Sequence, residues 1–153
     1  TKGYIREYIY NLLTIYNKSI LLFNILPIIP LDGSKIINLI LSKYLYYNLS
    51  NKLTIIISFI TIIIILITRI YEYNYSFIII LGLLMKNIYD FYKNLEYIYN
   101  KFILERYLYK ITYPKKKIIK NKKKMYKNKS HYFYINNQLL KEDDYLRSIY
   151  SKR

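Results

Sequence analysis

The chain has 153 residues, a net charge of +16 and a hydrophobic content of 54%. Its mean hydropathy of +0.04 conceals an apolar first part and a strongly basic last part, so the two parts are considered separately. The absence of cysteine excludes a disulfide framework, a cysteine metal site and a cysteine nucleophile. The composition therefore favours a membrane protein.

The first apolar segment covers residues 8–26. About twenty mostly apolar residues are needed to cross a bilayer, and polar residues are tolerated within a span where it faces a cavity. The polar interruptions here are Asn11, Asn17, Lys18 and Asn24. Pro27 and Pro30 each remove a backbone donor and favour extended geometry in the residue before them, so the helix is predicted to end near Leu26.

Asp32 follows this break, a few residues after the apolar segment ends. Irregular backbone at membrane depth is tolerated where it is buried in protein or lines a wet cavity, and an ionisable residue there is a candidate functional group. In the alternative interpretation Asp32 lies in an ordinary turn, and its side chain caps the next helix by accepting from the first free amides. The local pattern leaves both interpretations open.

A short helix and a secure membrane span are predicted next. Residues 34–47 indicate an interfacial helix with one polar stripe, made by Lys35, Asn38 and Ser42. Residues 53–68 contain no charge and are rich in isoleucine. They predict a membrane span that reaches about residue 71, because the Arg69 side chain can extend to the interface.

The chain is then predicted to return across the bilayer. A polar loop around Glu72 and Asn74 precedes a second span over residues 76–92. From residue 88 to about 110, apolar residues recur at helical spacing opposite charged ones, which predicts an amphipathic helix. It is either an extension of the span packed on its own protein or an independent membrane-surface helix. In neither case are Glu96 and Glu105 catalytic.

The last part of the chain is basic. Residues 115–129 hold nine lysines and no acidic residue, which predicts a cytoplasmic location and attraction to anionic lipid headgroups. The run lacks the arginines and aromatic platform typical of base recognition, which argues against a nucleic-acid partner. Residues 131–140 predict a small hairpin, and Glu142 opens a short helix. His131 is interpreted as a surface or packing histidine, because it has no partner ligands in the sequence.

Residues 24–33 read Asn-Ile-Leu-Pro-Ile-Ile-Pro-Leu-Asp-Gly. This segment resembles the second signature motif of the site-2-type intramembrane zinc metalloproteases, in the branch of stage IV sporulation protein FB, and the similarity covers most of residues 15–110. The resemblance implies that Asp32 is a zinc ligand, and that Asn24 and Pro30 line the active site and the substrate cleft. Ser34 stands where the family usually has a second glycine.

The family's His-Glu-x-x-His motif, which supplies two zinc ligands and the general base, is absent from this chain. A catalytic zinc needs three protein ligands, so the resemblance implies that the motif lies upstream of Thr1 and that this chain, which has no catalytic residue of its own, is the C-terminal part of a longer enzyme. It further implies one zinc ion, a membrane-tethered regulatory proprotein as substrate, possible involvement in sporulation, and a bacterial cell membrane as the location.

The predicted class is therefore all-α: a polytopic helical membrane protein with a short basic cytoplasmic tail. Residues 1–110 would form the membrane domain and residues 111–153 the tail, which is too short and too basic for the regulatory nucleotide-binding domain that often ends this branch. The rival hypothesis is a catalytically inactive membrane-anchored binding or adaptor protein with Asp32 as a helix cap. Substituting Asp32→Asn should preserve the function of an adaptor and cripple a protease.

Overall fold

The computed structural model describes residues 2–68, 75–135 and 138–150, with side chains from residue 7 onward. Arg69, Glu72 and Asn74, which belong to the predicted end of one span and the loop after it, lie outside the described residues, as do residues 136 and 137 within the predicted hairpin. Five α-helices come first along the chain: α1 (Lys2–Ile25), α2 (Asp32–Tyr44), α3 (Tyr47–Thr68), α4 (Tyr75–Lys93) and α5 (Leu95–Tyr109). Helices were predicted at all five places.

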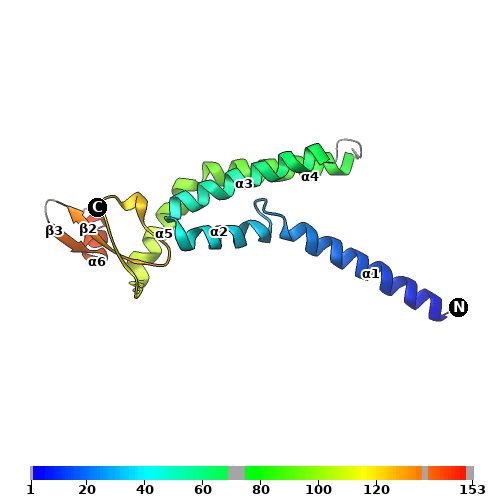
Figure 1. Ribbon diagram of the computed structural model, residues 1–153, viewed down its shortest axis with the longest axis horizontal. Coiled ribbons are helices and arrows are strands. Elements are labelled where there is room, and N and C mark those ends of the chain that lie inside the picture. The colour runs from blue at the N-terminus through cyan, green and yellow to red at the C-terminus, as the bar shows by residue number, and fades with distance from the viewer. Residues whose placement is uncertain (1, 69–74, 136–137, 151–153) are drawn as a thin grey trace.

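Helices α3 and α4 lie side by side, α2 runs along α3, and α1 projects away from the other helices (Figure 1). Helix α1 ends at Ile25, as the two prolines predicted. Most of its described apolar side chains are exposed, including Leu13, Ile20 and Leu22. A helix with so much uncovered apolar surface requires an apolar environment or partner.

One helix of the described chain, α3, is long and apolar enough to cross a membrane. This agrees with the predicted span over residues 53–71 as far as its described part extends. The predicted spans over residues 8–26 and 76–92 fall in α1 and α4, which form helices of 24 and 19 residues. Their membrane crossing stays a prediction.

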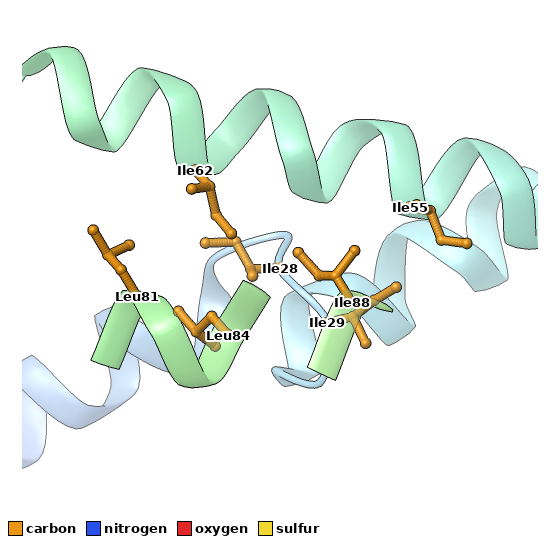
Figure 2. Packing of buried hydrophobic residues seen from close by; sticks show 7 residues of the cluster. All are labelled: Ile28, Ile29, Ile55, Ile62, Leu81, Leu84 and Ile88. Carbon is orange, nitrogen blue, oxygen red and sulfur yellow. The ribbon is translucent and has the colours of Figure 1, made fainter. Parts of the chain in front are cut away.

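The loop between α1 and α2 supplies part of the helical core. Ile28 and Ile29 are buried together with Ile55 and Ile62 of α3 and with three residues of α4, namely Leu81, Leu84 and Ile88. Figure 2 shows the two loop isoleucines pointing into the space between α3 and α4. The loop that contains the prolines is therefore held between α3 and α4, and it fixes where α2 begins.

The end of the chain folds into a small sheet with a helix. Strands β1 (Lys116–Ile119) and β2 (Ser130–Ile135) pair in parallel, and β2 pairs antiparallel with β3 (Gln138–Lys141). A short 3₁₀ helix, η1 (Lys122–Lys124), lies between β1 and β2, and α6 (Glu142–Tyr150) packs on the sheet. The hairpin and the last helix confirm the prediction. The all-α class needs correction, because the tail contains a three-stranded sheet, of which the lysine-rich strand β1 was not predicted.

Helix α5 joins the helices α3 and α4 to this sheet. Its side chains Tyr99, Phe102 and Ile103 are buried in a second apolar cluster. The other members come from the last forty residues: Ile119, Met125, Phe133 and Leu146. Of the two interpretations of the amphipathic helix, the structure supports packing on its own protein, and α5 together with the folded tail forms one unit.

Candidate functional site

Asp32 occupies the first turn of α2 with an exposed side chain. Its Oδ1 lies 2.7 Å from the Nζ of Lys35, one turn later on the same helix face. The N-cap residue is Leu31, and no side chain caps the helix there. The interpretation of Asp32 as a helix cap is therefore wrong, because Asp32 is the first residue of the helix. Its negative charge there interacts favourably with the positive end of the helix dipole.

Gly33 brings the start of α2 against the end of α1. A Cβ atom built on Gly33 would lie 1.9 Å from the carbonyl oxygen of Ile25 and 2.5 Å from that of Leu26. Only a residue without a side chain allows this approach. The Asp-Gly pair of the motif thus has a physical meaning in the fold, since the glycine fixes the position of the aspartate relative to α1.

The loop that precedes Asp32 is tied to α3 by Ser58, a side chain with no exposed surface. The Ile29 amide donates to Ser58 Oγ over 3.2 Å. Ser58 Oγ has one proton to donate, and it lies 3.1 Å from the carbonyl oxygen of Pro27 and 2.8 Å from that of Thr54. These bonds satisfy polar groups of an irregular backbone that is enclosed among helices. Ser58 therefore holds the loop that positions α2.

Ser58 belongs to a buried polar stripe within the apolar helix α3. Ser50, Thr54 and Ser58 recur every fourth residue, and all three are buried. Asn38 of α2 faces this stripe, where its Nδ2 donates to Asn51 Oδ1 at 2.7 Å and to Thr54 Oγ1 at 3.0 Å. The sequence patterns singled out Asn38 but not the polar residues of α3. Their four-residue spacing within a membrane span is a signal for an interhelical contact.

A cleft of about 400 Å³ opens beside this polar contact. Pro30 lines it with Lys35 and Asn38 of α2 and with Asn51 and Thr54 of α3; its other lining residues are Ile29, Ser34, Leu39, Tyr47, Phe91, Ile98 and Lys127. Pro30 also lines a second cavity next to α4, which includes Asp90 and Asn94. The volume of the cleft is within the range of roughly 300–1,000 Å³ typical of binding pockets.

The three residues predicted for the site are placed as follows. Pro30 is exposed at the cleft, and Asp32 lies two residues further on, at the start of the helix that forms one wall. Asn24 is half-buried in the last turn of α1. Neither Asn24 nor Asp32 is among the residues that line the cleft. The structure thus brings Pro30 to a cleft and leaves the other two beside it.

The described residues contain no group of three or more His, Cys, Asp or Glu side chains that could hold a metal ion. Asp32 fits as a single ligand, because its carboxylate is exposed at a helix start and is engaged by one flexible lysine. A catalytic zinc requires three protein ligands. Two further ligands would have to come from residues other than those described.

His131 is buried and serves packing, which agrees with one of the two roles predicted for it. Its Nε2 accepts from the Tyr126 amide at 2.9 Å, and its Nδ1 lies 3.0 Å from Glu142 Oε2. Glu142 also receives hydrogen bonds from the buried Arg106. Burial raises the pKa of Glu142, but the hydrogen bonds from His131 and Arg106 outweigh burial and hold that pKa below its ordinary value.

Two comparisons with known proteins bear on this site. Residues 3–68, which include α1, the loop, α2 and α3, match the model of peptidase family M50. The chain is also similar to "Stage IV sporulation protein FB" of Bacillus subtilis (strain 168), with 32% identity over 105 residues. That match covers 67% of this chain and 36% of the relative, so the chain spans well under half of its relative's length. The chain is therefore related to the site-2-type metalloproteases of peptidase family M50, in the branch of stage IV sporulation protein FB.

Proposed function

We propose that this chain contributes the Asp32 part of the active site of an intramembrane zinc metalloprotease that cleaves a membrane-tethered regulatory protein. The observation that carries the proposal is the placement of Asp32. Its carboxylate is exposed at the first residue of α2, next to a loop wedged between α3 and α4. A regulatory proprotein, and a link to sporulation, are the substrate class and setting that the similarity to a sporulation protein suggests.

In this proposal Asp32 is one of three zinc ligands, and the other two are histidines that lie outside this chain. Zinc, when bound, supplies activation of water for attack on a peptide carbonyl. The residues of this chain position the site. Gly33 and Ser58 set the place of Asp32, as their contacts with Ile25 and Ile29 indicate.

The substrate would lie along the loop and the cleft beside it. Pro30 is exposed at the cleft, in a loop that turns so that the Leu31 amide donates to the carbonyl oxygen of Ile28. Asn24, half-buried in the last turn of α1, would orient the substrate from the N-terminal end of the loop. These two assignments are supported by the resemblance of the motif.

The proposed location is a bacterial cell membrane, crossed by α1, α3 and α4, with the folded tail in the cytoplasm. Support comes from the uncovered apolar surface of α1 and from the composition of α3. The lysines of β1 and η1 are exposed, and η1 packs near the start of α3, so they would contact anionic lipid headgroups.

The test is substitution of Asp32 in the complete protein, followed by measurement of zinc content and substrate cleavage. Asp32→Ala and Asp32→Asn should each lower both, because Asn has no carboxylate to offer the metal. Asp143→Asn is a matched control, since Asp143 is also an exposed carboxylate in the first turn of a helix. Retained zinc and retained cleavage in the Asp32 variants would refute the ligand assignment.

A further inference from the structure

The residues that line the cleft include one from the tail. Lys127 lies in the loop between η1 and β2, almost one hundred residues after Pro30, and both residues line the same cleft. The side chain of Lys127 is exposed. The tail is therefore part of the cleft rather than a separate appendage.

The loop over residues 125–129 is fixed from two directions. On one side the Tyr47 amide of α3 donates to the carbonyl oxygen of Met125 at 2.8 Å. On the other side the buried Arg106 of α5 donates to three loop carbonyls, those of Tyr126, Lys127 and Lys129, over 3.4, 3.3 and 2.8 Å. Backbone held in this way places Lys127 at the cleft without constraining its ammonium group.

The charged residues that line the cleft itself are both lysines. Lys35 and Lys127 line it, and no carboxylate does so among the described residues. Lys35 is paired with Asp32, whereas the described residues offer Lys127 no ion pair. Asn38 and Asn51 also line the cleft, where their amide groups bond to each other.

We propose that this cleft binds the cytoplasmic flank of the substrate polypeptide, and that Lys127 selects flanks carrying acidic side chains. The inference rests on the proposed function, in that it concerns the polypeptide that the same site would cleave. Opposite charges at a partly exposed site add selectivity of modest size. The tail thereby takes part in substrate choice.

The test measures binding and does not depend on cleavage. A single cysteine is placed by Leu39→Cys, at an exposed position that lines the cleft of a chain with no cysteine of its own. In the complete protein, stripped of other cysteines and held in neutral detergent, it is cross-linked to synthetic peptides. Each peptide has one apolar span, a flank of two Glu, two Gln or two Lys, and a cysteine beside the flank.

We expect the Glu flank to cross-link at least about threefold faster than the Gln flank at low salt, the size available to an exposed ion pair, with the difference shrinking as salt screens it. Lys127→Glu should reverse the order of the Glu and Lys flanks. Lys123→Glu, an exposed lysine of η1 that does not line the cleft, should leave the order unchanged.

Equal rates for the three flanks, an unchanged order in Lys127→Glu, or no cross-linking of any peptide would each overturn the inference. Its failure is distinguishable from failure of the proposed function, which zinc content and cleavage report. A protein that contains zinc and cleaves without a charge preference retains the proposed function and loses this inference. A protein that sorts peptides by charge but holds no zinc loses the protease assignment and retains a peptide-binding cleft.

Discussion

Replacing Gly33 with alanine tests whether the approach of α2 to α1 positions Asp32. The added Cβ would lie 1.9 Å from the Ile25 carbonyl oxygen, whereas ordinary contacts begin at 3.4 Å. Because the obstructing atoms are backbone, the start of α2 must move by roughly 1 Å or more, and overpacking of this kind costs about 1–3 kcal/mol in stability. A displacement of about 1 Å in a catalytic group can lower activity about 100-fold.

The matched control is Gly82→Ala. Gly82 lies in the middle of α4, and a Cβ there would meet nothing within 4 Å. Alanine at such a helical position should be neutral or stabilise by about 0.5–1 kcal/mol. The assay compares unfolding in mixed micelles, zinc content and cleavage for the two variants of the complete protein. Equal stability and equal activity of Gly33→Ala and Gly82→Ala would refute the reasoning.

Three further predictions follow from the contacts described. Ser58→Ala should leave the Ile29 amide without its acceptor at a cost of about 2 kcal/mol, and so speed the hydrogen exchange of that amide by roughly 30-fold. The control is Thr61→Val, because the Thr61 hydroxyl bonds to the carbonyl oxygen of Ile57 in its own helix. Equal exchange of the Ile29 amide in the two variants would argue against the role of Ser58 in holding the loop. The lowered pKa of Glu142 means that its charged form stabilises the tail above the ordinary glutamate value of 4.5 and that this stability is lost as the pH falls through the lower folded-state pKa. The protection of β2 amides against hydrogen exchange, measured relative to the intrinsic rate at each pH, should therefore fall below about pH 4.5 in the unmodified protein, and a variant Glu142→Gln that kept the same pH response would contradict the assignment. Single cysteines at Tyr75 and Lys123 should react with a membrane-impermeant maleimide from opposite sides of the membrane, and labelling from one side would rule out the proposed topology.

Local patterns predicted most of the elements, because those patterns reflect forces between near neighbours. Pro27 and Pro30 remove donors within the loop itself, and α1 ends at Ile25 as predicted. The uncharged run in α3 and the hairpin after His131 likewise follow from short segments of sequence. The all-α class was wrong because the predicted hairpin belongs to a sheet, and the third strand of that sheet was not predicted. Residues 116–119 read Lys-Lys-Ile-Ile, which shows too little alternation to indicate a strand, and the pairing that makes them one comes from β2.

The candidate site was predicted only in part. Asp32, Pro30 and Asn24 could be identified from the motif because they are close in sequence. Ser58 could not, since its role depends on a contact with a loop 29 residues earlier. Lys127 was one of nine lysines in a basic run, and its place at the cleft depends on carbonyl contacts from Arg106.

The sequence by itself determined where the helices break, which segment is apolar enough to cross a membrane, and that a carboxylate follows the break. These properties depend on the dihedral preferences and hydrophobicity of consecutive residues. The tertiary structure alone decided that Asp32 lies within the helix rather than at its cap, that Gly33 contacts the end of α1, and that a lysine of the tail reaches the cleft. Such relations depend on close approach between distant segments, which shape and hydrogen bonding settle only when the whole chain packs.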